Sequence, residues 1–358
     1  MFKRKNVVNI PVPKNISVFY NFGFILGVTW ISQVASGIIL ASSYTPSWIT
    51  YYKVINTIED INIGYLIRFV HSNGASLLFT LLFIHTARGL YYKSYKKKNT
   101  WYMGSFILLV AIAVSFIGYV LPNNQISYWG CTVITRIITE IPLIGPQIVV
   151  LIWGGPEISQ FTINRLFAFH FFLPIASIAI IAIHIVALHR RGSRNPTGIT
   201  TSTSKSQFLS FSVVKDISML IVTATLFIIV VILKPLIFGD NDNFNMADKI
   251  DTPHHIQPEW YFLFAYAILR AIPNKMGGVF ALFSSVLFVI LIPMLGLKKR
   301  IISSTNKTIV YKILFWVFVG NFLVLTWLGS KPADGPFPII SCVATIIYFN
   351  FFLIRPNF

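Results

Sequence analysis

The sequence predicts an all-α, polytopic membrane protein with eight transmembrane helices, and three observations lead to this fold class. Hydrophobic residues make up 55% of the 358-residue chain, whereas charged residues make up only 11%. The mean hydropathy is strongly positive, at +0.71. Apolar runs close to the roughly 20 residues that cross a bilayer as a helix recur along the chain. Such a composition is typical of a polytopic membrane protein and not of a soluble fold with one core.

Eight apolar runs are long enough to span a membrane. They cover residues 18–44, 64–92, 101–121, 161–190, 211–236, 276–297, 309–329 and 337–355. A shorter run at 141–155 is interrupted by Pro and Gly, so we expect it to be interfacial and not to span. We expect two domains, an N-terminal four-helix domain at 1–200 that carries the cofactors and a C-terminal four-helix domain at 201–358. The connections at 122–160 and 235–275 are the ones long enough to hold a site.

Basic residues are concentrated in alternate connections between these spans. Twenty of the 29 Lys and Arg residues lie in the segment up to Lys14, in residues 88–98, 190–215 and 298–312, and at Arg355. The positive-inside rule turns this asymmetry into an orientation with both termini on the inner face. The net charge of +18 is therefore a topology signal, and we expect the lipid bilayer and no nucleic acid as a partner.

Two spans carry histidines at one repeated interval. His71 and His85 in the second span are fourteen residues apart, and so are His170 and His184 in the fourth. One span intervenes, so these two spans run in the same direction across the membrane. His71 is then level with His170, and His85 with His184. Fourteen residues advance a helix by roughly 21 Å and return nearly to the same face, which predicts two stacked pairs of imidazoles.

A single intramembrane histidine would be read as an interhelical hydrogen bond or a proton relay. Opposed imidazoles at two depths instead fit the axial ligands of a non-covalent b-type haem, whose iron has no vacant position and can only pass electrons. We therefore expect two haems inside the bundle of the first four spans. The outer haem would be held by His71 and His170, and the inner haem by His85 and His184.

Glycines and arginines accompany these histidines. The first and third spans each contain two glycines fourteen residues apart: Gly23 and Gly37, and Gly104 and Gly118. Repeated at the haem interval, they would remove side chains where a porphyrin must lie against backbone. Arg68, Arg88 and Arg165 stand three to five residues from a histidine. We interpret them as candidates for pairing with haem propionates, although topology alone also places arginines near helix ends.

Several stretches resemble a known family over almost the full length of the chain. They are "YNFGFILG", the four histidines, "GYVLP…QISYWGCTVIT", "NPTGI", "HHIQPEWYFLFAYAILRAIPNKMGG" and "FLVLTWLG". Together they resemble cytochrome b, the membrane subunit of the cytochrome bc complex, or respiratory complex III. The Pro-Glu-Trp-Tyr stretch, which lies in the predicted C-terminal domain, is the most specific. An unsplit chain of eight spans resembles the mitochondrial and bacterial form, whereas the photosynthetic relative divides this sequence between two polypeptides.

The resemblance implies an electron-transfer subunit of ubiquinol–cytochrome c reductase. Quinol would be oxidised at an outer site, electrons would cross through an outer low-potential and an inner high-potential haem, and quinone would be reduced at an inner site, with proton translocation. The implied partners are a Rieske iron–sulfur protein, a cytochrome c-type subunit and other complex III subunits, in a homodimeric complex. The implied location is the mitochondrial inner membrane with both termini on the matrix side, or alternatively the bacterial plasma membrane.

The resemblance places the outer quinol pocket around Glu259. This is the only acidic residue in the apolar-aromatic stretch "IQPEWYFLFAYAIL". Glu259 could merely cap the helix that follows it, or it could accept a quinol proton as a partly desolvated carboxylate with a raised pKa. The resemblance favours the second role. It also implies that Tyr261, Tyr266 and the segment 125–140 line the pocket.

The inner quinone pocket is expected at His189 and Asp216, where an acid–imidazole pair could deliver protons to a quinone. By sequence alone, a surface histidine beside two arginines is the better explanation of His189. The family pattern favours the quinone contact and adds Ser193 and Lys215.

The chain departs from the family where "GYVLP" is usually followed by Trp-Gly. Here Asn123 and Asn124 follow, and the loss of a Gly costs backbone freedom unless the Asn adopts a left-handed conformation, which Asn tolerates better than most residues. Inhibitor sensitivity and the local shape of the outer pocket are the properties that this departure would change. Two other functions compete with the main interpretation. One is a haem-free transporter with a histidine proton relay, and the other is the diheme membrane anchor of another quinone-linked dehydrogenase or reductase.

Overall fold

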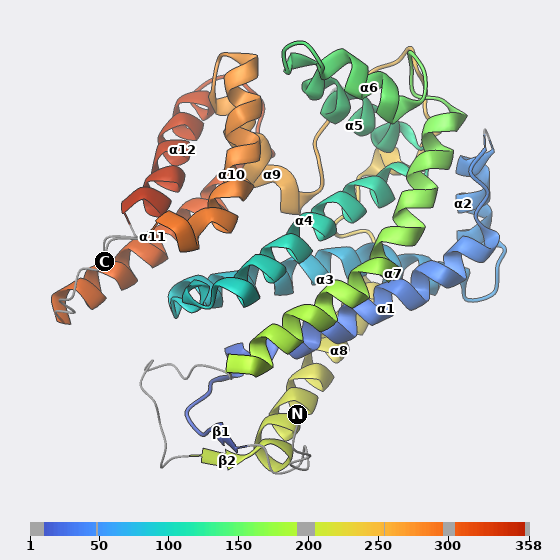
Figure 1. Cartoon of the computed structure of the whole chain (residues 1–358). Helices are drawn as coiled ribbons and strands as arrows, with labels where there is room; N and C mark the ends of the chain where they lie inside the picture. Colours follow the sequence, from blue (N-terminus) through green and yellow to red (C-terminus); the bar gives the residue numbers. More distant parts are fainter. Residues whose placement is uncertain (1–10, 48, 192–204, 254, 296–304, 355–358) are drawn as a thin grey trace. The chain divides into compact units, whose positions relative to one another are not determined.

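The computed structural model describes residues 11–47, 49–191, 205–253, 255–295 and 305–354 (Figure 1). Its described part contains eight helices long and apolar enough to cross a membrane. They are α1 (Phe22–Ser43), α3 (Gly64–Tyr91), α4 (Lys98–Val120), α7 (Gln160–Arg191), α8 (Val214–Leu233), α10 (Lys275–Leu295), α11 (Thr305–Gly329) and α12 (Phe337–Ile354). A π-helical turn, η5 (Phe208–Val213), extends α8 at its N-terminus. The eight predicted spans are confirmed, with ends that agree within four residues.

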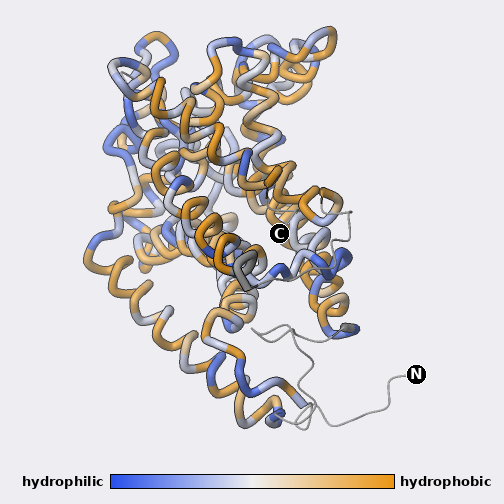
Figure 2. Tube along the Cα trace, turned by 90° about the vertical axis from the view of Figure 1, so that its left-hand side faces the viewer, coloured by the Kyte–Doolittle hydropathy of each residue, from blue (hydrophilic) through white to orange (hydrophobic). Residues whose placement is uncertain are grey.

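Hydrophobic residues dominate the long helices, and hydrophilic residues concentrate in the connections (Figure 2). Large apolar side chains such as Ile31, Leu226 and Trp316 are exposed on these helices. Exposure of this kind fits contact with lipid, where only the backbone polar groups must be satisfied within the helix. The chain is an integral membrane protein.

Short elements occupy the connections. They are the helices α2 (Thr50–Glu59), α5 (Gln125–Arg136), α6 (Gly145–Trp153) and α9 (Leu263–Ala271), the single turns η2 (Val18–Tyr20), η3 (Ser94–Lys96), η4 (Ile137–Glu140), η6 (Asn241–Phe244) and η7 (Trp260–Phe262), and two strands, β1 (Pro11–Pro13) and β2 (Lys205–Gln207). The strands pair antiparallel with Pro11 opposite Gln207. The nine-residue α6 covers only about 14 Å. It is therefore no span, as the Pro and Gly in this run predicted, and its place at the interface stays a prediction.

The described residues divide into two compact units. The first combines segments within 1–43, 55–112 and 171–237, and the second combines segments within 44–54, 113–170 and 238–358. Helices α4 and α7 each contribute residues to both units. The predicted domain boundary at residue 200 lies outside the described residues, and that division stays a prediction.

The first unit is built on α3. Helix α1 packs along it, and α8 packs against both (Figure 1). Polar groups inside the unit are satisfied by backbone carbonyls, as apolar surroundings require. The Asn73 amide donates to the carbonyl of Pro235 at 2.9 Å, and the Trp30 indole donates to that of Pro174 at 3.2 Å.

The second unit is built on α9, against which α10, α11 and α12 pack. Gly329 lets the end of α11 approach the start of α9, because a Cβ there would collide with the carbonyl of Leu263. Arg270 in α9 donates to the carbonyls of Leu328 and Gly329 at 2.9 and 3.1 Å. These contacts hold the segment that directly follows Glu259.

Candidate functional site

Each of the four predicted ligand histidines lies against one of the four predicted glycines. A Cβ on the glycine would meet the imidazole Cε1 at 3.2 Å for Gly23 and His85, at 3.0 Å for Gly37 and His71, and at 3.0 Å for Gly104 and His184, with a still closer approach for Gly118 and His170. Gly27, on α1 between the first two glycines, has no described atom within 4 Å of such a Cβ. The fourteen-residue interval thus brings specific side chains together. The imidazoles lie against these glycines, and contact between the glycines and a porphyrin stays a prediction.

The Nδ1 atoms of two histidines have acceptors. In the first unit, Nδ1 of His71 lies 3.0 Å from the hydroxyl of Ser36. In the second unit, Nδ1 of His170 lies 2.9 Å from the carbonyl oxygen of Val114. A carbonyl can only accept, so His170 carries its proton on Nδ1 and its lone pair on Nε2. That tautomer is the one in which Nε2 can bind a metal, so these residues fit an axial haem ligand.

The other two histidines lie together in the first unit. His85 and His184 are close enough to interact electrostatically. Nη2 of Arg88 lies 3.3 Å from Nδ1 of His85. His184 interacts with the backbone of Thr100, but its Nδ1 lacks a partner with hydrogen-bond geometry among the described residues. A half-buried pair of imidazoles, with one buried nitrogen that lacks a partner, fits a site whose polar partner is a bound group.

The three candidate arginines differ in their surroundings. Arg88 is half-buried, its guanidinium carbon lies 4.8 Å from the ring centre of Tyr20, and its Nε is buried without a partner among the described residues. Such a cation fits an anionic group of a cofactor. Arg68 is half-buried one turn before His71 on α3. Arg165 is exposed, and its Nη1 donates to the carbonyl of Leu151 at 2.6 Å. This contact caps α6, so the structure adds no support for a propionate role of Arg165.

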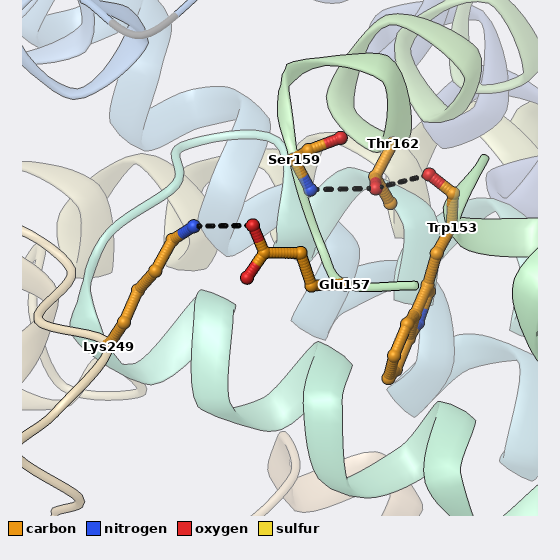
Figure 3. Close-up of polar contacts among 5 residues, drawn as sticks. All are labelled: Trp153, Glu157, Ser159, Thr162 and Lys249. Carbon is orange, nitrogen blue, oxygen red and sulfur yellow. Dashed lines mark hydrogen bonds and ion pairs between the residues drawn. The ribbon is translucent and has the colours of Figure 1, made fainter. Parts of the chain in front are cut away.

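The N-terminus of α7, the helix that carries His170, is fixed by a short chain of hydrogen bonds (Figure 3). The N–H of Ser159 donates to the hydroxyl of Thr162 at 3.0 Å, and this hydroxyl donates to the carbonyl of Trp153 at 2.6 Å. Beside it, Lys249 and Glu157 form an ion pair at 3.6 Å, with both side chains more than half exposed. An exposed pair of this kind contributes little to stability, so the buried hydrogen bonds define where α7 begins.

Glu259 occupies the N-cap position of η7, but its side chain makes no capping hydrogen bond. The alternative that this carboxylate serves as a helix cap therefore has no support in the structure. Burial, and to a lesser extent the charge of Asp240, raises the pKa of Glu259 to about 7. A carboxyl group with such a pKa exchanges a proton near neutral pH.

Two tyrosines follow Glu259 along the chain. Tyr261 is 4% exposed, interacts electrostatically with Glu259 and hydrogen bonds to Ser115, and burial raises its pKa well above the ordinary value. It is therefore a neutral hydroxyl beside the carboxyl group. The ring centre of Tyr266 lies 4.5 Å from the guanidinium carbon of Arg270, which places this tyrosine in a cation–π contact.

The two asparagines that depart from the family pattern have separate backbone roles. Asn123 has φ +53°, a left-handed conformation, whereas Asn124, which stands where the family has Gly, has φ −89°. Asn124 caps α5, since its side chain accepts from the N–H of Ser127 and the Ser127 hydroxyl accepts from the N–H of Asn124. This reciprocal capping box fixes the start of the segment 125–140.

Helix α5 is also tied to the loop before the Glu259 segment. The Gln125 amide donates to the carbonyl of Asp251 at 2.7 Å and accepts from the N–H of Asp248 at 2.7 Å. The Trp129 indole donates to the carbonyl of Asp248 at 2.9 Å. The segment predicted as a pocket wall thus lies beside the loop that leads to Glu259, while its contact with a quinol stays a prediction.

At the predicted inner pocket, Asp216 accepts a 2.6 Å hydrogen bond from the Asn21 amide. Lys215 donates to the carbonyl of Ile16 at 3.2 Å and lies 4.0 Å from the ring centre of Phe211. His189 is exposed on α7 and forms no ion pair with Asp216 within the described residues. Ser193 lies outside the described residues.

Sequence reasoning missed the partners that hold these groups. Ser36 contacts His71, Asn21 donates to Asp216, and the charge of Asp240 raises the pKa of Glu259. None of these three partners was predicted from the sequence. Asn21 stands in "YNFGFILG", so the motif contained its signal. The signal for Ser36 is that a polar residue directly precedes Gly37, which was expected to face the haem.

Comparison with known proteins assigns the family. The profile described as cytochrome b/b6/petB matches residues 7–192, and the profile described as cytochrome b(C-terminal)/b6/petD matches residues 246–349. A solved structure described as "Hyperthermophilic respiratory Complex III" is similar with a TM-score of 0.91 and 28% sequence identity, covering 97% of this chain and 92% of that chain. The chain therefore belongs to the cytochrome b family, whose members bind b-type haem, and it is an electron-transfer subunit of a respiratory cytochrome bc complex.

Proposed function

We propose that this chain oxidises ubiquinol at an outer site and reduces ubiquinone at an inner site, with two b haems carrying electrons between them and with proton translocation. The observation that carries the proposal is the pairing of each of four histidines with one of four glycines, at the same interval in four helices. A single structural histidine would need no such repeat.

The residues that would hold the outer haem are His71 and His170, and those that would hold the inner haem are His85 and His184. A bound haem supplies reversible one-electron transfer with no vacant coordination position. The chain's own residues fix the imidazoles: Val114 orients His170, and the four glycines admit the rings. Arg88, with its unpartnered Nε, would neutralise a propionate, and Arg68 is the corresponding candidate near His71.

Glu259 would act as the proton acceptor for quinol. Its carboxyl group is partly buried and has no capping role, and its pKa of about 7 lets it take a proton and release it again near neutral pH. Tyr261 and Tyr266 would form apolar and polar walls of the same pocket. The negative charge of Asp240 repels the ionised carboxylate of Glu259 and therefore favours the protonated form of Glu259.

Asp216 would deliver protons at the inner site. The Asn21 amide fixes one oxygen of its carboxylate, which leaves the other oxygen for a ligand. His189, Lys215 and Ser193 are the further candidates for contact with the quinone, and His189 is exposed. The proposed partners are a Rieske protein, a cytochrome c-type subunit and a second copy of the complex. The proposed location is the mitochondrial inner membrane with matrix-side termini, or a bacterial plasma membrane.

An optical redox titration of the purified complex tests the proposal. We expect two b-type haems that titrate separately, and we expect His184→Leu and His170→Leu each to remove one of them. His189→Leu, on the same helix but outside the ligand set, should keep both haems. A wild-type complex with a single titrating centre, or a colourless preparation that still oxidises quinol, would contradict the proposal.

Glu259→Gln separates the proposal from the rival diheme anchor. The variant should retain both haems and lose most quinol oxidation, because an amide cannot accept the proton. Unchanged quinol oxidation with intact haems would favour the membrane anchor of another quinone-linked enzyme.

A further inference from the structure

The two histidines of α3 meet different groups at Nδ1, and the difference begins at Ser36. The Ser36 hydroxyl lies 2.8 Å from the carbonyl of Ser32 and 3.2 Å from that of Gln33. It lies 3.0 Å from Nδ1 of His71. A hydroxyl has one hydrogen, and here the backbone carbonyl of the preceding turn takes it. The oxygen therefore accepts from the Nδ1–H of His71, which leaves the imidazole lone pair on Nε2.

Within the described part of the chain, His85 has no equivalent contact with a hydroxyl. Fourteen residues before Ser36, the interval that relates the two sites, the chain has Phe22, whose side chain offers no acceptor. The polar group that faces Nδ1 of His85 is Arg88 at 3.3 Å, and a guanidinium can only donate. One imidazole of α3 thus faces an acceptor, and the other faces a cation.

The histidines of α7 follow the repeat more closely. His170 interacts with the carbonyl of Val114 and His184 with the backbone of Thr100, and these two residues are themselves fourteen apart. Only the first contact has full hydrogen-bond geometry. One chemical difference between the two predicted haem sites is therefore the hydroxyl of Ser36 at His71 against Phe22 at the matching position of the His85 site.

We propose that Ser36 is a positioning residue for His71 and lowers the midpoint potential of the haem that His71 binds. An acceptor at Nδ1–H makes an imidazole a more basic ligand, and a more basic ligand favours the oxidised iron. The inference rests on the proposed function, since it needs both haems, and it gives a physical cause for an outer haem of lower potential than the inner one.

The test is a potentiometric optical titration of the purified complex carrying Ser36→Ala, with Thr29→Ala as the matched control. Thr29 lies on the same helix, is buried to the same extent, and donates to the carbonyl of Ile25 at 2.9 Å, but it contacts no histidine among the described residues. We expect Ser36→Ala to raise the potential of the outer haem and to leave that of the inner haem unchanged. Thr29→Ala should change neither potential.

Two further variants keep the test decisive if Ser36→Ala loses its haem. Ser36→Thr keeps the hydroxyl and should keep the wild-type potential, whereas Ser36→Cys has a weak acceptor of similar size and should raise the potential of the outer haem. An unchanged potential in both Ser36→Cys and Ser36→Ala, with both haems present, would overturn the inference and leave the proposed function intact. Absence of two separable haems in the wild type would instead refute the proposed function.

Discussion

The pH dependence of quinol oxidation should report the carboxyl group of Glu259. A rise of its pKa from the ordinary 4.5 to about 7 corresponds to about 3 kcal/mol in favour of the neutral form. About a tenth of the carboxyl is then ionised at pH 6 and about nine tenths at pH 8. If the ionised group accepts the quinol proton, kcat/KM of the purified complex should rise roughly tenfold across this window. Glu259→Gln should abolish this limb of the profile.

The neighbouring acid provides the control. Asp240→Asn removes the negative charge that contributes to the raised pKa, so the limb should move to lower pH. Asp242 lies in η6, directly after its N-cap residue Asp240 and Asn241, and does not contribute to the raised pKa of Glu259. Asp242→Asn should therefore leave the pH at which kcat/KM rises unchanged. A profile that keeps its limb in Glu259→Gln would refute the reasoning. The reasoning would also be refuted if the rise of kcat/KM with pH shifted equally in Asp240→Asn and Asp242→Asn.

The same shift has a consequence for stability. The folded state holds the Glu259 proton more tightly than the unfolded state. The stabilisation is therefore complete below about pH 4.5 and is lost as the pH rises through about 7. Glu259→Gln, which stays neutral, should raise the thermal midpoint of the complex at pH 8 relative to the wild type. The gain should vanish at pH 5.

Further predictions concern the packing and the caps. Gly118→Ala should displace the imidazole of His170 and reduce the haem content in difference spectra, whereas Gly27→Ala should keep it, since no described atom opposes a Cβ there. Asn124→Ala should cost about 1 kcal/mol through loss of the capping box, measured as a lower thermal midpoint. Asn123→Gly should be tolerated, because glycine adopts the left-handed backbone without strain, and Asn123→Val should lower the midpoint by more than Asn124→Ala.

The spans were predictable because one physical requirement decides them. A helix in lipid needs about 20 apolar residues and satisfies its own backbone, so length and hydropathy locate α1 or α12 without any tertiary information. A left-handed Asn in this pair was predictable for a similar reason, since few side chains tolerate that backbone, but the structure has it at Asn123 and not at Asn124, which stands where the family has Gly. Both properties belong to the local chain.

Contacts between helices were predictable only where they repeat. The fourteen-residue interval singled out His71 and Gly37 independently, and the structure brings them together. Arg165 shows the limit of this reasoning. Its distance along the helix from His170 suits a propionate contact, but its guanidinium reaches the end of α6, whose position depends on the turn at Gly154. A pattern within one helix carries no information about where a flexible side chain finds its partner.

The repeat also explains which differences between the two predicted haem sites the sequence can reveal. Val114 and Thr100 present backbone carbonyls, which every residue has, so their interval leaves no trace in side-chain identity. Ser36 and Phe22 are also fourteen residues apart, but one side chain has a hydroxyl and the other is apolar. This break in the repeat can therefore be seen in the sequence. Two sites built by one repeated geometry can acquire different potentials only where the repeat fails in a side chain or a charge. Position 36 is such a failure, and substitutions there should change the difference between the two haem potentials by more than substitutions at positions where the repeat holds.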